Sequence, residues 1–332
     1  MKIDRKELLD TLQSVAPGLS NQAIIEQSTH FLFQDSRVYT FNDEITVSNE
    51  LKLPFSGAVL AVPLLSLLSK MPDEKIKMEE NEEGITVRGR RQTAFLHKEA
   101  EICNPLDVVE EPGEWKALPA NFMGVLRNAA LCAGNDESRF LLTCVHITDK
   151  YVEATDNMQA VRYQIQTPIE NAIVPVESIN KMRKMEVNKV STTKNWIHFG
   201  CGDLRLSCRA YYEHFPNLNF LLEHEGMDVT LPEGMEWAVK KADIFASELS
   251  ADRSLQITLQ DNLMTVRGTG MSGWFEEKQI VSWGQKPLTF NITTGMIENL
   301  FSRKRRCKVG KNKISIKGEH YTYVVGLSGD RK

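Results

Sequence analysis

Three segments of the chain share the same arrangement of apolar and polar residues. Each begins with an apolar run that contains a proline or an asparagine, and continues with the spacing of a short amphipathic helix. The segments are AVPLLSLLSKM from Ala61, IVPVESINKMRKM from Ile173 and FNITTGMIENLFSR from Phe290. They recur at intervals of about 112 and about 116 residues, the size of a small domain. The repetition predicts three equivalent units.

A second predicted helix opens each of these units. The three helices are RKELLDTLQSVA from Arg5, PANFMGVLRNAALCA from Pro119 and WAVKKADIFASEL from Trp237. Residues of alternating polarity, separated by polar or glycine turns, lie between the two helices of a unit and follow the second one. The later series fall in residues 75–97, 189–212 and 306–327. Every unit is therefore predicted as helix, strands, helix, strands.

The predicted fold is α+β, with two helices packed on an antiparallel sheet in each of three domains. Proline-rich or acidic linkers divide the chain into domains at 1–112, 113–227 and 228–332. The outermost strand of such a sheet has unpaired backbone groups, which invite another strand to join. Repeats joined edge to edge are predicted to close into a ring, with helices on one side and sheets on the other.

The composition indicates several folded domains and excludes a general nucleic-acid coat. A chain of 332 residues with 42% hydrophobic residues is too long for one ordinary core and too apolar for disorder. Its net charge of -4 argues against tight phosphate binding over the whole surface, but a balance near zero can hide a segregated field. No apolar run of about 18 residues is present, and Met1 leads into charged residues. The protein is predicted to be cytoplasmic, without membrane contact.

No catalytic or metal-binding motif stands out in the sequence. GxSxG, P-loop and HExxH patterns are absent, and no GxGxxG pattern opens a predicted helix. His146, Asp149 and Asp156 fall on one predicted strand pair, but surface and turn roles are favoured over an acid–base or metal cluster. The six cysteines lack a CxxC pair, which is typical of reduced, buried thiols; they are Cys103, Cys132, Cys144, Cys201, Cys208 and Cys307. We predict a protein that is not an enzyme and has no cofactor or metal.

Three strings carry a family resemblance through their order and spacing. They are ATDNMQAV from Ala154, IVPVESINKMRKM from Ile173 and YYEHFPNLNFLL from Tyr211. Together they resemble the bacterial β sliding clamp, the processivity subunit of the replicative DNA polymerase III. The resemblance extends over essentially the whole chain; it is strongest from about residue 140 to 222 and from LTFNITTGMIENL to YVVGL. A chain shorter than typical members also suits a compact or phage-encoded relative.

The resemblance implies a homodimer of three-domain subunits, which forms a six-domain ring around double-stranded DNA. The helices would line the hole, and the partners would be the replicative DNA polymerase and a clamp loader. Family partners dock through short peptides in a groove between the second and third domains. By position, this groove is expected to contain Leu141, Thr155, Asp156, Asn157, Met158, Gln159, Ala160, Pro216, Phe220, Leu221, Asn291, Thr294, Val324, Val325, Gly326, Leu327 and Ser328.

The groove strings depart from the family pattern at two places. Asn157 to Ala160 replace the Gly-His-Arg-Leu stretch that is common after the Thr-Asp, and GLSGDRK replaces the usual apolar, proline-containing tail. The resemblance therefore predicts a groove at this place whose preferred peptide differs.

Basic residues gather on or beside the predicted helices, whereas acidic residues gather in turns and linkers. A ring needs only a weakly positive lining, because firm phosphate contacts would slow sliding. For any one base the alternative is a solvated helix face, and for the RKRR cluster it is a helix C-terminus. The residues expected to face DNA are Lys2, Arg5, Lys6, Lys70, Arg127, Lys181, Arg183, Lys184, Lys240, Lys241, Arg303, Lys304, Arg305 and Arg306.

The resemblance also points to two edge strands as the subunit contact. Phe95 and Leu96 lie in QTAFLH of the first domain, and Ile280 and Val281 lie in EEKQIVSW of the third. Backbone pairing across these edges would give a contact that occurs twice per ring. The alternative is that the four side chains pack within their own domains.

Three functions remain for comparison. The leading one is a DNA sliding clamp that acts as a processivity factor. A clamp-fold adaptor or decoy would bind clamp partners without encircling DNA, as the altered groove residues suggest. A small-molecule enzyme is motivated only by the region around His146.

Overall fold

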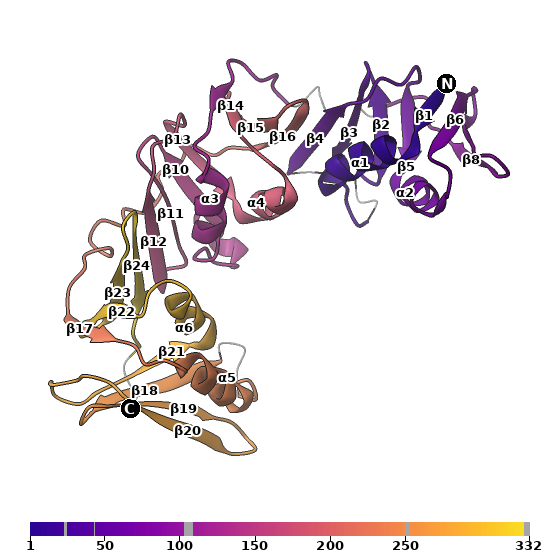
Figure 1. The fold of residues 1–332 in the computed structure, drawn as a ribbon. Coiled ribbons are helices and arrows are strands. Elements are labelled where there is room, and N and C mark those ends of the chain that lie inside the picture. Colours follow the sequence, from indigo (N-terminus) through magenta and orange to yellow (C-terminus); the bar gives the residue numbers. More distant parts are fainter. Residues whose placement is uncertain (23–24, 43, 103–108, 250–252, 329–332) are drawn as a thin grey trace. The chain divides into compact units, whose positions relative to one another are not determined.

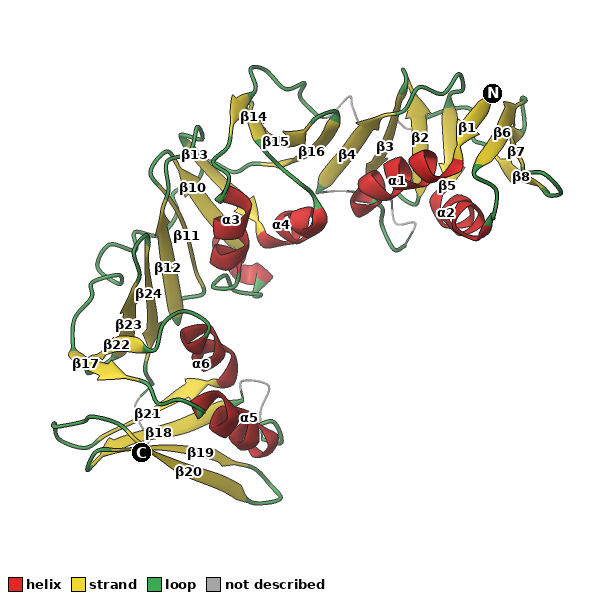
Figure 2. Cartoon of the chain, in the orientation of Figure 1, coloured by secondary structure: helices red, strands yellow, loops and turns green. Residues whose placement is uncertain are grey.

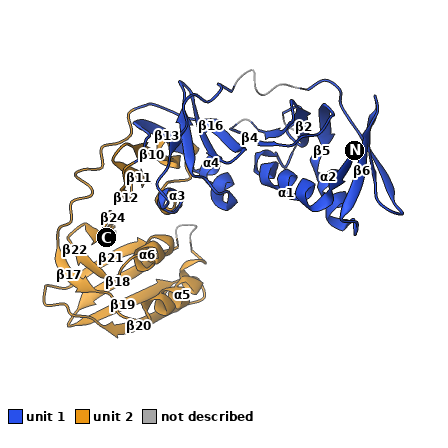
Figure 3. Ribbon diagram, turned by 45° about the horizontal axis from the view of Figure 1, so that its top comes forward, with its two compact units in different colours: residues 1–127, 167–213 blue, residues 128–166, 214–332 orange. Residues whose placement is uncertain are grey.

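The computed structural model describes residues 1–22, 25–42, 44–102, 109–249 and 253–328 (Figure 1). The chain divides into two compact units, each made of two chain segments (Figure 3). Unit 1 comprises Met1–Arg127 and Thr167–Glu213; unit 2 comprises Asn128–Gln166 and His214–Lys332. None of the described helices combines the length and the apolar composition needed to span a bilayer.

The six α-helices in the described residues lie where the hydrophobic periodicity predicts them. Asp4 caps the first helix by accepting from the backbone N–H groups of Lys6 and Glu7. Leu8, Leu12 and Val15 of this helix are buried at the spacing of one helical face. The described α-helices are α1 (Arg5–Val15), α2 (Ala61–Lys70), α3 (Phe122–Ala130), α4 (Val176–Lys181), α5 (Met235–Ala246) and α6 (Thr294–Phe301).

Unit 1 contains two antiparallel sheets. The smaller one has the order β1 (Lys2–Asp4), β6 (Lys75–Glu80), β7 (Gly84–Arg88) and β8 (Thr93–His97). The larger one has the order β5 (Gly57–Leu60), β2 (His30–Gln34), β3 (Arg37–Phe41), β4 (Ile45–Glu50), β16 (Leu204–Arg209), β15 (Trp196–Cys201), β14 (Lys189–Thr192) and β9 (Lys116–Ala117). A further strand, β13 (Asn171–Pro175), leads into α4.

Unit 2 repeats this arrangement of a larger and a smaller antiparallel sheet (Figure 2). The strands of its larger sheet that belong to unit 2 have the order β10 (Cys144–Thr148), β11 (Tyr151–Thr155), β12 (Gln159–Gln164), β24 (Tyr321–Gly326), β23 (Lys313–Lys317), β22 (Arg306–Val309) and β17 (Met227–Thr230). The smaller sheet has the order β20 (Trp274–Ile280), β19 (Leu263–Thr269), β18 (Ser254–Gln260) and β21 (Leu288–Thr293).

Helix α5 packs closely on the smaller sheet of unit 2 because β19 carries a glycine at the contact. A Cβ atom on Gly268 would lie 2.0 Å from the carbonyl oxygen of Ala242 in α5. Any side chain at this position would therefore displace the helix. Ala238, Val239 and Ala242 of α5 are fully buried, so small side chains on both elements allow the approach.

The predicted order of elements is confirmed in each third of the chain. The expected joining of repeats edge to edge is confirmed as well, by two antiparallel pairings between distant segments. β16 pairs with β4 from Arg205↔Ser48 to Cys208↔Ile45. β12 pairs with β24 from Gln159↔Val325 to Tyr163↔Tyr321. The domain boundaries at 1–112, 113–227 and 228–332 stay a prediction.

The cysteines are reduced thiols in the described part of the chain. Cys132, Cys144, Cys208 and Cys307 are buried, as predicted, whereas Cys201 is half-buried and Cys103 lies outside the described residues. Burial raises the pKa of the Cys132 thiol to about 12, which keeps this group neutral.

Candidate partner-binding groove

A tight turn between β11 and β12 forms one end of the candidate site. Asp156 Oδ1 accepts hydrogen bonds from the backbone N–H groups of Met158 and Gln159, at 2.8 and 2.7 Å. Thr155 Oγ1 accepts from the Asn157 N–H at 3.1 Å and donates to the Gln159 carbonyl at 2.7 Å. Asn157 has φ 75°, a left-handed conformation that asparagine adopts more readily than most residues. These bonds fix the turn at whose tip Met158 lies, 46% exposed.

The two faces of the larger sheet of unit 2 carry different side chains. Tyr163 on β12 and Tyr323 on β24 lie against Arg303, which follows α6. Because side chains alternate along a strand, Ala160 and Val324 point to the opposite face. We call this opposite face the outer face.

Residues 214–226, named the strap below, are attached to the outer face first at β10 and β12. The ring of Phe215 stacks on the ring of His146, with 4.9 Å between the centroids. Arg162 Nη1 donates to Asn219 Oδ1 at 2.6 Å. The first half of the strap is thus held by one ring contact and one charge-assisted hydrogen bond.

The second half of the strap is attached to β23. Lys313 Nζ donates to the Leu221 carbonyl at 3.4 Å, and His224 Nδ1 lies 2.8 Å from Ser315 Oγ. Phe220 and Leu221 lie between the contacts made by Asn219 and His224, and their side chains are 77% and 43% exposed. The strap therefore presents two large apolar side chains beside the sheet rather than burying them.

A buried carboxylate connects the strands beneath the strap. Glu153 is 2% exposed; it accepts from Arg162 Nε at 2.7 Å and lies 2.9 Å from His146 Nδ1. Asp149 is exposed in a turn, and Asp156 caps the β11–β12 turn. Structural roles thus account for His146 and Asp156, and Asp149 is a surface residue. Among the described residues, no group of three or more His, Cys, Asp or Glu side chains is placed to hold a metal ion.

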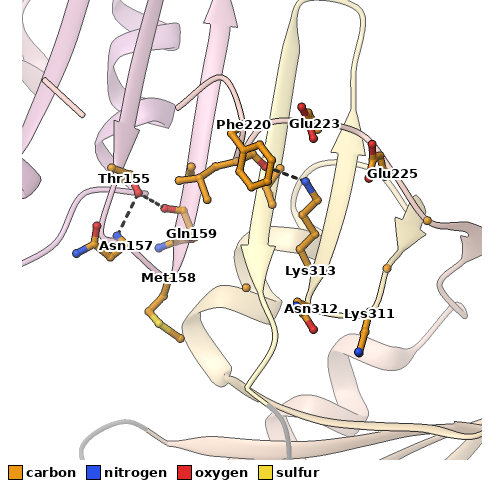
Figure 4. Close-up of a pocket in the computed structure, with 16 residues that line it drawn as sticks. Thr155, Asn157, Met158, Gln159, Phe220, Glu223, Glu225, Lys311, Asn312 and Lys313 are labelled. Carbon is orange, nitrogen blue, oxygen red and sulfur yellow. Dashed lines mark hydrogen bonds between the residues drawn. The ribbon is translucent and has the colours of Figure 1, made fainter. Parts of the chain in front are cut away.

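A cavity of about 530 Å³ lies between the strap, the β11–β12 turn and the β22–β23 turn (Figure 4). Met158 and Phe220 flank it, and Ala160 and Val324 contribute small apolar side chains from the sheet. Apolar lining with a few polar groups is the usual chemistry of a peptide or ligand groove. The lining residues are Thr155, Asn157, Met158, Gln159, Ala160, Phe220, Leu221, Glu223, Glu225, Gly226, Gly310, Lys311, Asn312, Lys313, Val324 and Gly326.

The structure brings nine of the expected groove residues together in this cavity. They are Thr155, Asn157, Met158, Gln159, Ala160, Phe220, Leu221, Val324 and Gly326. The others do not line it: Leu141, Asp156, Pro216, Asn291, Thr294, Val325, Leu327 and Ser328. Val325 is fully buried, and Thr294 Oγ1 donates to Asp243 inside unit 2. Asn291 and Ser328 pair through their backbones at 2.8 and 3.2 Å.

Sequence reasoning missed the charged end of the cavity. Glu223 and Glu225 lie on the strap, and Lys311 and Lys313 lie at the β22–β23 turn. None of the strings that carry the family resemblance includes them. Two features of the sequence could have indicated these residues. Glu223 closely follows the apolar pair Phe220 and Leu221, and a Gly-Lys-Asn turn that contains Lys311 precedes β23.

Comparison with known proteins supplies the fold. No family model and no curated protein matches the sequence. The structure is similar to the DNA polymerase III subunit beta of Pseudomonas aeruginosa, with a TM-score of 0.85, 15% identity and coverage of 99% of both chains. A sliding clamp of Bartonella birtlesii bound to griselimycin gives a TM-score of 0.86 at 14% identity, again over 99% of both chains. The beta subunit of Thermotoga maritima gives 0.82 at 14% identity, over 99% of this chain and 98% of that one.

The fold is that of a sliding clamp. The match extends over nearly the full length of both chains, so it includes both compact units. Identities of 12–15% leave the groove, the charges and the edges to be judged from this chain's own residues.

One of the expected DNA-facing bases, Arg303, is half-buried. The Arg303 guanidinium lies over the rings of Tyr163, Tyr321 and Tyr323, at 5.8, 5.6 and 4.4 Å from their centroids. Its Nη1 donates to the Tyr163 hydroxyl, and its Nη2 donates to Cys132 Sγ at 3.4 Å. Groups of unit 2 therefore surround much of the Arg303 guanidinium, and a DNA-facing place for Arg303 stays a prediction.

The rest of the RKRR cluster lies beyond the helix and is partly neutralised. α6 ends at Phe301, so the cluster does not form its last turn. Arg305 pairs with Glu233 at 2.8 Å, and Arg306, the first residue of β22, pairs with Asp228 at 3.5 Å. Lys304 is exposed.

The remaining expected DNA-facing bases differ in exposure. Lys2 lies in β1 rather than on a helix, and Arg5 donates to the carbonyls of Leu68 and Asp73 at 2.8 and 2.9 Å. Arg127 and Lys181 are half-buried. Exposed bases are Lys2, Lys6, Lys70, Arg183, Lys184, Lys240, Lys241, Lys304, Arg305 and Arg306.

The two expected contact strands are edge strands of their sheets. β8 ends the smaller sheet of unit 1, and β20 ends the smaller sheet of unit 2. Phe95 is 43% exposed and Ile280 84% exposed, while Leu96 is half-buried. Val281 is 3% exposed and packs within unit 2, so its expected place at the subunit contact is corrected.

Proposed function

We propose that this protein is a DNA sliding clamp that encircles duplex DNA and tethers the replicative DNA polymerase as a processivity factor in the cytoplasm. The observation that carries the proposal is the match of the whole chain to DNA polymerase III beta subunits, over 99% of both chains in the P. aeruginosa case. The protein acts without a catalytic step. A clamp loader is its further partner.

The mechanism is topological. A closed ring stays on duplex DNA without base contacts, so it slides wherever the polymerase moves. The lining needs only modest positive charge, because firm phosphate contacts would hold the ring in place. Exposed bases on α5 and in the segment that follows α6 suit this role, and Lys240 and Lys241 lie on one turn of α5. The groove binds the tethering peptide of the polymerase.

The proposed ring is a homodimer whose two subunits pair β8 of one copy with β20 of the other. Both strands end their sheets and therefore have unpaired backbone groups on one side. Phe95 and Ile280 expose apolar side chains on these strands, which backbone pairing would cover. The same contact occurs twice in a two-fold symmetric ring.

Retention on DNA tests the proposal. The protein is loaded on nicked circular DNA with a clamp loader, washed at moderate salt and recovered by gel filtration with the circle. An encircling ring stays with the circle and leaves after a restriction enzyme linearises the DNA. Equal retention on linear and circular DNA would overturn encirclement, and release from both at the wash would leave only a partner-binding protein.

A further inference from the structure

The two sides of the groove carry opposite charges at the end away from Met158 (Figure 4). The strap contributes Glu223 and Glu225 on one side, and the β22–β23 turn contributes Lys311 and Lys313 on the other. Lys313 is already engaged, because its ammonium donates to the Leu221 carbonyl at 3.4 Å. Lys311 is exposed at the tip of the turn.

The two carboxylates of the strap are accessible in the groove. His224, which lies between them in sequence, is held toward β23 by its 2.8 Å contact with Ser315 Oγ. Glu223 and Glu225 line the cavity, so their carboxylates can reach a ligand bound in the groove. Both are exposed, and among the described ion pairs none joins either of them to a base.

We propose that this groove selects peptides in which a basic side chain flanks the apolar anchor. This inference rests on the proposed function and names the chemistry of the partner. The apolar side chains of the peptide pack against Met158, Phe220 and Val324, and an arginine or lysine beside them reaches Glu223 and Glu225. Apolar burial supplies most of the affinity, and charge complementarity supplies discrimination between partners.

An acidic peptide fits this end of the groove less well. Its carboxylates would be attracted to the ammonium of Lys311, but they would be repelled by the two carboxylates of the strap. A peptide fails to bind tightly when a like charge faces it, so specificity comes from repulsion as well as from attraction. Exposed ion pairs contribute roughly 0.2–1 kcal/mol each, so two of them correspond to a preference of about two- to thirtyfold.

The test uses three fluorescein-labelled peptides with one common core of leucine and phenylalanine, flanked by two arginines, two glutamines or two glutamates. Fluorescence anisotropy of the full-length protein gives the three dissociation constants. We expect the arginine peptide to bind about two- to thirtyfold more tightly than the glutamine peptide, and the glutamate peptide to bind most weakly. In the double variant Glu223→Gln/Glu225→Gln, the arginine peptide should lose its higher affinity relative to the other two peptides. High salt should have the same effect on the native protein, because it screens the charges.

Two controls separate the failure of this inference from failure of the groove itself. Glu233→Gln removes an exposed carboxylate that does not line the cavity and leaves the order unchanged. Phe220→Ala weakens all three peptides together if the groove binds them. Equal affinities for the three peptides, with loss of all three in Phe220→Ala, would overturn the charge preference and keep the groove. No binding of any peptide would overturn both, while retention on circular DNA tests the ring independently.

Discussion

Arg162 and Asn219 join the sheet of unit 2 to the strap through one hydrogen bond of 2.6 Å, from Nη1 to Oδ1. The same guanidinium donates to Glu153 through Nε and Nη2, at 2.7 and 2.6 Å. The residue after Asn219 is Phe220, which is 77% exposed at the groove. A buried ion pair therefore holds the segment that presents an apolar side chain to the partner.

Asn219→Ala should weaken peptide binding without unfolding the protein. The substitution removes the acceptor for Arg162, so Phe220 samples more orientations and binding must restrict them. We expect a loss of affinity of about three- to tenfold, because hydrogen bonds to charged groups are worth roughly 1.5–3 kcal/mol in folded proteins and part of this is recovered from water. Asn219→Asp keeps an acceptor oxygen and should retain affinity. Equal affinity of the Ala variant and the native protein would show that the strap is held by its other attachments.

Arg162→Met should lower the stability of unit 2. Glu153 is 2% exposed and would lose its strongest cationic partner, and breaking a buried pair typically costs about 3–5 kcal/mol. Thermal unfolding gives the midpoint for this variant and for Arg162→Met/Glu153→Gln, in which the buried charge is also removed. The double variant should regain part of the lost stability. An unchanged midpoint in the single variant would mean that Glu153 is satisfied without Arg162.

Arg303→Met should also act on stability rather than on DNA. Its guanidinium lies 4.4 Å from the Tyr323 ring centroid and donates to the Tyr163 hydroxyl, so the variant leaves that hydroxyl without this donor. We expect a loss of about 2–4 kcal/mol in chemical denaturation, with retention on DNA unchanged at a temperature where the fold persists. Lys304→Gln is the matched control, because Lys304 is exposed beside it. This control should leave stability unchanged. A stable Arg303→Met protein that leaves DNA at lower salt would place Arg303 in the DNA-facing set.

Periodicity was sufficient to predict the helices because each buries one clear apolar face. In α1, Leu8, Leu12 and Val15 lie at helical spacing behind the Asp4 cap, and these features are local in sequence. The pairing of β12 with β24 joins strands about 160 residues apart, and no local pattern specifies it. Threefold repetition supplied that information, because each repeat leaves an open edge.

The site was predicted only where a string matched the family pattern. The β11–β12 turn and Phe220 fall in such strings and line the groove. Glu223 and Lys311 were missed because a charged side chain on a connecting segment has no periodicity that would indicate which way it faces. The environment of Arg303 was missed for a related reason, since the RKRR string does not reveal that its first member contacts three tyrosines on β12 and β24.

His198 should make the protein less stable as the pH falls. The residue is fully buried on β15, with Nδ1 2.8 Å from Ser207 Oγ, and burial lowers its pKa from 6.5 to about 4. Between these two values the unfolded chain binds the proton and the folded chain does not, so stability increases with pH through this window. At pH 5, protonation of His198 in the unfolded chain should lower the free energy of unfolding by about 1–2 kcal/mol. His198→Asn should remove this loss, whereas the exposed control His214→Gln should keep it. Identical pH profiles for native protein and His198→Asn would contradict this assignment.

Ile280→Glu should separate the subunits of the proposed ring while leaving each subunit folded. Ile280 is 84% exposed at the end of the edge strand β20, so a carboxylate there costs the isolated chain little. In a pairing with β8 of the second copy the same carboxylate would be desolvated opposite an apolar edge that includes Phe95, which disfavours association. Light scattering after gel filtration should give the mass of one chain for this variant and twice that mass for the native protein. Met271→Glu alters a residue that is 81% exposed but lies between β19 and β20, off the strand edge, and should stay dimeric. A dimeric Ile280→Glu variant that remains on circular DNA would place the subunit contact on another surface.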